Sequence, residues 1–143
     1  MSTEDEVRQA SKRFYAALNR MANGDASPMA DVWSHSASVT TMHPIGGREV
    51  GWDAVEGPWR QVAGLASEGR ITLANQHIHA TDDMAVEVGD EQGQFTLAGE
   101  KVSVEHRVTN VYRREAGEWK VVHHHTDLSP AMVEVLGRLQ AAT

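Results

Sequence analysis

Histidine is the residue type with the most chemistry to offer in this sequence. The 143 residues include eight histidines and no cysteine, which excludes a thiolate nucleophile and any cysteine-based metal site. A neutral imidazole, with an ordinary pKa of about 6.5, can take a proton from a substrate at neutral pH. His43 stands directly before Pro44, where a β-like run must turn. We therefore take His43 as the first candidate for a general base; the alternative is a rim residue bonded only to backbone.

Two histidine pairs have a spacing that suits metal binding, His77 with His79 and His123 with His125. Side chains two residues apart on a strand point to the same face, so each pair can chelate zinc, copper or iron. A metal site also needs a third ligand and residues that orient the ligands. Glu105 or Asp127 could supply a carboxylate if the strands adjoin, but the sequence does not place them together. We expect no metal ion and no cofactor, and a metal site stays the alternative.

Aromatic side chains and one carboxylate indicate the walls of a pocket. Trp33 and Trp59 lie on or near predicted helices, and aromatic walls suit flat or apolar ligands; ordinary core packing is the alternative. Glu87 lies in the apolar run Val86-Glu87-Val88. If it faces a cavity it is a candidate acid or base, and if it faces solvent it is an ordinary polar residue of an alternating strand.

These side chains must be positioned by helices that precede a long antiparallel sheet, which is an α+β arrangement. The first helix begins with a Thr3–Glu6 capping box, and Pro58 either kinks a later helix or marks its start. Turns are expected at Gly46-Gly47 and at residues 91–93. The periodicities predict helices over residues 3–21, 28–33, 52–65 and 131–139, and strands over 36–42, 71–80, 84–88, 102–114 and 118–128.

Alternation in the last two strands predicts which side chains face a cavity. The more apolar face of 102–114 carries Val102, Val104, His106, Val108, Asn110 and Tyr112. The same parity in 118–128 turns Val122, His124 and Thr126 inward. It turns Trp119, Val121, His123, His125 and Asp127 outward, toward an expected dimer interface.

The composition and the missing motifs exclude several classes of function. Apolar residues at 41% and charged residues at 23% are ordinary for one globular domain, which we place over residues 1–143. The net charge of −7 disfavours nucleic acid as a partner. The polar N-terminus is no signal peptide and no apolar run can span a membrane, so we expect a cytoplasmic protein. Phosphate-binding glycine loops, serine-hydrolase elbows and dinucleotide fingerprints are absent.

Three stretches of the sequence are similar to a known superfamily. They are Arg13–Asn19 with Asn23-Gly24-Asp25, then Met42-His43-Pro44 with Gly46-Gly47, and then Thr109–Arg114 with Gly117-Glu118-Trp119 and His123–His125. Together they resemble the nuclear transport factor 2-like superfamily, which includes SnoaL-like polyketide cyclases, ketosteroid isomerase and the calcium/calmodulin-dependent kinase II association domain. The resemblance implies a cone-shaped curved sheet around N-terminal helices, a pocket at its open end and a homodimer through the outer sheet face.

The resemblance also implies roles for particular residues. In the isomerase-like members the residue before the matching proline is the basic aspartate, and here it is His43. The matching oxyanion-hole tyrosine falls on Phe14, with Tyr15 beside it, which argues against a literal ketosteroid isomerase. Two pocket arginines of the kinase association domain match Asn110 and Thr126, so an acidic ligand held by arginine is not supported at these positions.

Taken together, the sequence predicts a small-molecule-binding protein, with a cofactor-independent isomerase or lyase as its enzymatic form. His43 would remove a proton next to a carbonyl, while Asn110, His124 and Tyr112 would donate hydrogen bonds to the developing oxyanion. The ligand would be small and apolar or aromatic. The alternative is a ligand-binding or oligomeric association domain without turnover. The predicted pocket walls comprise Tyr15, Trp33, Trp59, Glu87, Val108, Tyr112 and Thr126.

Overall fold

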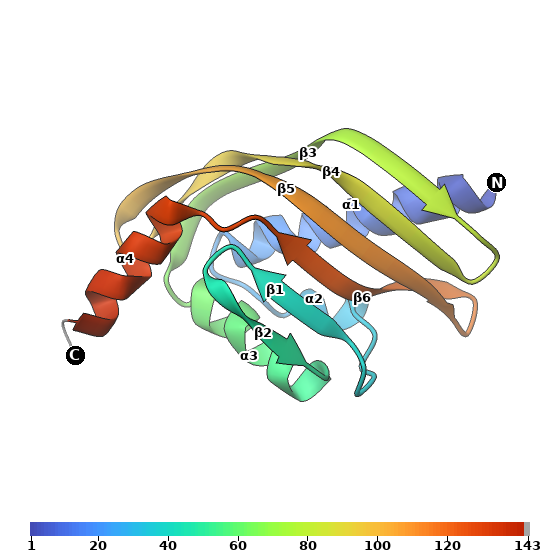
Figure 1. Ribbon diagram of the computed structural model, residues 1–143, viewed down its shortest axis with the longest axis horizontal. Helices are drawn as coiled ribbons and strands as arrows, with labels where there is room; N and C mark the ends of the chain where they lie inside the picture. The colour runs from blue at the N-terminus through green and yellow to red at the C-terminus, as the bar shows by residue number, and fades with distance from the viewer. Residues whose placement is uncertain (142–143) are drawn as a thin grey trace.

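The computed structural model describes residues 1–141, which form one curved sheet with helices packed against it (Figure 1). The helices are α1 (Thr3–Met21), α2 (Met29–Val32), α3 (Trp52–Ala63) and α4 (Pro130–Ala141). The strands are β1 (Thr40–His43), β2 (Gly46–Val50), β3 (Ala66–Ala80), β4 (Met84–Leu97), β5 (Glu100–Glu115) and β6 (Glu118–Thr126). The α+β class and the curved sheet predicted from the sequence are confirmed.

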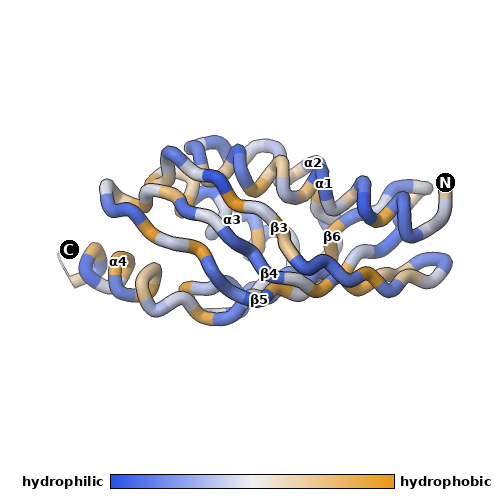
Figure 2. Tube along the Cα trace, turned by 90° about the horizontal axis from the view of Figure 1, so that it is seen from above, coloured by the Kyte–Doolittle hydropathy of each residue, from blue (hydrophilic) through white to orange (hydrophobic). Residues whose placement is uncertain are grey.

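The sheet has the order β2-β1-β6-β5-β4-β3 and does not close on itself. Strands β3 to β6 form an antiparallel meander, whereas β1 pairs with β6 in parallel. Helices α1, α2 and α3 lie on one side of the sheet (Figure 2). The apolar side of α1, which includes Val7, Phe14 and Leu18, is buried there. The space between α1, α3 and the curved strands therefore holds the core.

The ends of the helices follow local capping rules, with one correction. Helix α1 has the predicted bounds, but the capping box is formed by Ser2 and Asp5 rather than by Thr3 and Glu6. Ser2 adopts extended backbone geometry and its hydroxyl accepts from the Asp5 amide, as an N-cap requires. Pro58 lies inside α3 and does not mark its start.

The turn predicted at residues 91–93 was wrong, because β4 runs through it to Leu97. Gly93 is a strand residue with φ +150°, and a Cβ there would lie 1.9 Å from the Arg70 carbonyl oxygen. Glycine is required at this position by a close approach between strands rather than by a turn. The chain reverses instead at Ala98 and Gly99, both in the left-handed region. A strand was also missed, since Gly46–Val50 forms β2.

The predicted facing of β6 was right in its second half and wrong in its first. His124 and Thr126 are buried as expected, but Trp119 and Val121 are buried too and Val122 is only half-buried. A register shift between Val111/Tyr112 of β5 and the facing residues of β6 explains the difference. A bulge of one residue reverses the side-chain parity beyond it, which strict alternation cannot anticipate.

Among residues 1–141, none of the helices combines the length and the apolar character that a membrane span requires.

Candidate functional site

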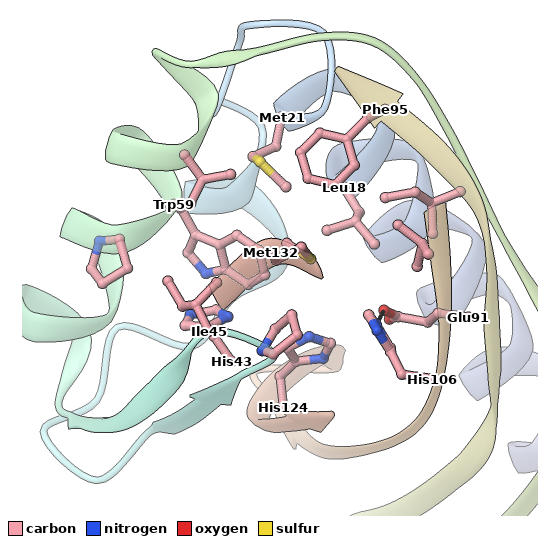
Figure 3. A pocket seen from close by; sticks show the side chains of 15 residues that line it. Leu18, Met21, His43, Ile45, Trp59, Glu91, Phe95, His106, His124 and Met132 are labelled. Atoms are coloured by element: carbon pink, nitrogen blue, oxygen red, sulfur yellow. Dashed lines mark hydrogen bonds and ion pairs between the residues drawn. The ribbon is translucent and has the colours of Figure 1, made fainter. Parts of the chain in front are cut away.

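A pocket opens where α1 and α3 meet β1 and strands β3 to β6, and Met132 of α4 forms part of its wall (Figure 3). Its free space is about 50 Å³, well below the ~300–1,000 Å³ of a typical ligand site. Three imidazoles and one carboxylate are its polar side chains: His43, His106, His124 and Glu91. Apolar side chains and tryptophan form the rest of the wall, namely Leu18, Met21, Pro44, Ile45, Pro58, Trp59, Val62, Ile71, Phe95, Val104 and Met132.

His43 ends β1 and turns its ring into the protein, as the sequence predicted for a pocket residue. The side chain is 7% exposed, and its ring meets the Trp59 ring edge-on at 4.6 Å between centroids. Its Nε2 lies 3.7 Å from Oε1 of Glu49 and makes no hydrogen bond. Burial lowers the pKa of His43 from 6.5 to about 4, because the cation would lose its hydration. His43 is therefore a neutral imidazole at neutral pH.

His124 of β6 is the second pocket imidazole, 6.0 Å from the His43 ring. Its Nδ1 lies 2.6 Å from Oδ1 of Asn110. Burial, followed by the nearby ring of His43, lowers the pKa of His124 well below its usual value. An amide oxygen can only accept, so Nδ1 carries the proton and Nε2 keeps its lone pair.

Asn110 lies behind His124 and not on the pocket wall. Its amide nitrogen donates to Oε1 of Glu87 at 3.0 Å and to the hydroxyl of Tyr15 at 3.0 Å. The hydroxyl of Tyr112 also donates to Oε1 of Glu87, at 2.8 Å. Neither Asn110 nor Tyr112 has a proton left for a substrate oxygen, so the oxyanion-donor roles predicted for them do not fit this geometry.

Two pocket residues were not named as site candidates from the sequence, His106 and Glu91. Nε2 of His106 lies 2.7 Å from Oε1 of Glu91, and Tyr15 donates to the other oxygen of that carboxylate at 2.9 Å. Nδ1 of His106 is buried without a partner. The alternation of residues 102–114 already turned His106 inward, which was the available signal. Glu91 was hidden because it fell in the turn that the sequence predicted.

The remaining sequence candidates lie in three places. Trp59 lines the pocket, whereas Trp33 packs one layer deeper against Phe14 and Trp59. Tyr15, Glu87 and Tyr112 belong to the buried hydrogen-bond network behind the pocket, and Glu87 is fully buried rather than solvent-facing.

Val108 and Thr126 lie away from these imidazoles. They line a separate, open groove beside Arg107 and Asp127. The structure therefore brings together the histidines, Trp59 and the buried network, and leaves these two residues outside.

Neither histidine pair has the surroundings of a metal centre. His77, His79 and His125 are exposed and His123 is half-buried. Within residues 1–141, no three side chains of histidine, aspartate or glutamate gather in a way that could hold a metal ion.

Comparison with solved structures places this fold among nuclear transport factor 2-like proteins. A candidate calcium/calmodulin-dependent protein kinase type II association domain from Thiobacillus denitrificans is 31% identical, with a TM-score of 0.68 over 84% of this chain and 92% of that one. A candidate dehydratase from Streptomyces avermitilis is 22% identical, with a TM-score of 0.75 over 88% and 95% of the two chains. A candidate ketosteroid isomerase from Shewanella frigidimarina is 21% identical, with a TM-score of 0.66 over 83% and 92%. At these last two identities, the likeness shows the fold alone.

The curated proteins contain no match to this chain. A model of the SnoaL-like domain matches residues 7–132, which span both the helical half and the whole sheet. All the residues that line the pocket lie within the matched residues. The chain therefore belongs to the SnoaL-like family.

Proposed function

We propose that this protein binds a small, mostly apolar carbonyl compound in the pocket and moves a proton on the carbon next to the carbonyl. The observation that carries the proposal is the pair of buried, neutral imidazoles, His43 and His124, on one apolar cavity. Such rings can accept a proton at neutral pH, and an apolar wall excludes the water that would compete for it.

The proton transfer follows from the positions of the free nitrogen atoms. Nε2 of His124 keeps a lone pair on a pocket-lining ring, and Nε2 of His43 has no hydrogen-bond partner. One ring takes the proton from the α-carbon, and the bonding electrons move onto the carbonyl oxygen. Return of the proton to another carbon gives an isomerase, and its transfer to a departing hydroxyl gives a dehydratase.

A donor to the developing oxyanion is required by this chemistry. Asn110 and Tyr112 are committed to the buried network, as shown above. The indole nitrogen of Trp59 is a buried donor without a partner, and Trp59 lines the pocket. We assign the indole nitrogen of Trp59 as the hydrogen-bond donor to the substrate oxygen, a role for which the sequence analysis proposed Asn110, His124 and Tyr112.

The size of the cavity limits the ligand. The free space of about 50 Å³ holds little more than a water molecule, so an organic ligand must displace side chains. Met21 and Met132 on the wall have flexible, unbranched side chains that can move aside. A compact cyclic ketone fits this arrangement better than a large rigid polycycle.

The test is deuterium incorporation at the α-carbon of small cyclic ketones in D₂O, followed by proton NMR. This readout needs no knowledge of the natural product. We expect wild-type protein to catalyse exchange, and at least one of His43→Gln and His124→Gln to remove it while the ketone still perturbs the tryptophan fluorescence of the protein. His125→Gln is the matched control, because His125 is adjacent in sequence but exposed on the other face. Exchange that continues unchanged in both pocket variants would exclude the proposal.

The second candidate function is an association domain, and the outer sheet face favours it. Met84, Val86 and Val88 of β4 are all exposed and alternate with buried residues on the same strand. A row of exposed apolar side chains on a sheet is typical of an interaction surface. We propose that this face joins two copies of the chain, and the two functions are compatible because the pocket lies on the opposite face.

A further inference from the structure

Glu87 is the most deeply buried carboxylate that the proposed chemistry does not use. It has no exposed surface and lies outside the pocket wall. Its two oxygens accept hydrogen bonds from Asn110, from Tyr112 and, at 2.6 Å, from Gln76. Burying a carboxyl group is expensive even when it is fully hydrogen-bonded, and an apolar residue would serve packing alone at lower cost. The effect of Glu87 on the hydrogen bonds of its neighbours can account for the burial of its carboxylate.

The contacts of Glu87 determine the direction of the hydrogen bonds between it and the pocket. A carboxylate only accepts, so it draws the amide nitrogen of Asn110 toward itself. With the nitrogen on that side, the amide oxygen of Asn110 must face His124. An oxygen there requires a proton on Nδ1 of His124, and a neutral imidazole has no second proton for Nε2.

The other bond made by Asn110 agrees with this direction. The amide nitrogen also donates to the hydroxyl of Tyr15, which must then direct its own proton elsewhere. It does so, donating to Glu91 at 2.9 Å. The hydrogen bonds of Asn110, Tyr15 and His124 are thus mutually consistent in one orientation of the Asn110 amide. If the amide were flipped, its nitrogen would donate to Nδ1 of His124, and the His124 ring would then carry its proton on Nε2.

We infer that Glu87 is a positioning residue for His124: through Asn110 it holds the imidazole proton on Nδ1 and leaves the Nε2 lone pair for the pocket. The inference rests on the proposed function for its purpose, since an Nε2 lone pair is what proton abstraction requires. The geometry on which it depends is independent of any substrate. Glu87, Asn110 and His124 then act together as carboxylate, amide and imidazole.

Glu87 acts on Asn110 through its acceptor oxygen. Substitutions can test the effect of this oxygen separately from the effect of the negative charge of Glu87. Glu87→Gln can place its amide oxygen where Oε1 lies and still accept from Asn110 and Tyr112. Glu87→Leu has a similar volume and offers no acceptor. Tyr112→Phe removes another hydrogen bond to the same oxygen and leaves the Glu87–Asn110 bond in place, so it is the matched control for the loss of a buried hydrogen bond.

The experiment is ¹⁵N NMR of histidine-labelled full-length protein at pH 8, which distinguishes a protonated from an unprotonated ring nitrogen. We expect His124 to be protonated on Nδ1 alone in the wild type, in Glu87→Gln and in Tyr112→Phe. In Glu87→Leu we expect a mixture of the two tautomers. The rate constant for α-proton exchange should fall in Glu87→Leu in proportion to the fraction of His124 that is protonated on Nε2, about twofold for an even mixture, with little change in KM, because the wrong tautomer removes the base without removing the pocket.

Two results would overturn the inference. The first is a wild-type His124 protonated on Nε2, which decides the question even if Glu87→Leu does not fold. The second is a folded Glu87→Leu protein that retains the Nδ1 proton as fully as the wild type. Because the tautomer is read without substrate, a protein that shows the expected tautomers but catalyses no exchange contradicts the proposed function and leaves the positioning of His124 intact.

Discussion

Replacement of His43 by glutamine should reduce the loss in the free energy of unfolding that this protein undergoes at acidic pH. Burial lowers the pKa of His43 from 6.5 to about 4. Below pH 6.5, His43 binds a proton in the unfolded chain but stays neutral in the folded protein until the pH approaches 4. The free energy of unfolding therefore decreases as the pH falls from 6.5 toward 4, and His43 does not affect it above that range. Glutamine does not titrate, and the variant should lack this loss.

The magnitude follows from the two pKa values. Each tenfold difference in proton affinity is about 1.4 kcal/mol, so the full effect is about 3 kcal/mol below pH 4. Between pH 8 and pH 5, the loss in the free energy of unfolding that comes from His43 is about 2 kcal/mol. His43 is only 7% exposed, so solvent screening reduces this value little. Burial of His124 acts in the same direction in both proteins, and only the smaller effect of the His43 ring on the pKa of His124 differs between them.

Urea denaturation at pH 8 and pH 5 measures the effect. The free energy of unfolding of wild-type protein should fall between the two pH values by about 2 kcal/mol more than that of His43→Gln. His125→Gln is the control, and its pH dependence should follow the wild type because His125 is exposed. The reasoning fails if His43→Gln loses as much stability as the wild type, or if NMR shows the His43 ring of the folded protein titrating near pH 6.5.

Three further predictions concern the core, the pocket and the outer face. Trp119→Ala should lower the free energy of unfolding by ~3–5 kcal/mol, and Trp119→Phe by less, because the ring is buried and its Nε1 donates to Glu6; near-wild-type melting would show that the ring is peripheral. Met132→Ala should enlarge the pocket and strengthen the binding of bulkier ketones, measured by calorimetry, and unchanged affinity across a size series would show that Met132 does not limit the cavity. Val86→Asp should convert a homodimer to monomers in sedimentation equilibrium, and a wild-type protein that is already monomeric would contradict the outer-face interface.

Several features of the fold were accessible from the sequence because they depend on local patterns. The bounds of α1 follow from a helical apolar repeat that ends before a glycine at φ +98°. The alternation in β5 placed His106, Asn110 and Tyr112 on the buried face, as the structure confirms. The residues that resemble the nuclear transport factor 2-like superfamily are consistent with the matched SnoaL-like domain.

What escaped the sequence was decided by contacts between distant segments. Gly93 suggested a turn, but the approach of the Arg70 backbone explains it, and only the paired strands show that approach. A bulge in the β5–β6 pairing turned Trp119 inward against simple parity.

The candidate site shows the same division. The sequence determined that His43 ends a strand before a proline and that His124 faces inward, because both depend on chain direction and alternation. Only the tertiary structure decided which nitrogen of His124 is free, since that depends on hydrogen bonds from Asn110, 14 residues away, and on Glu87, a further 23 residues from Asn110. Hydrogen-bond direction is a property of groups that the fold brings together, and no spacing along the chain records it.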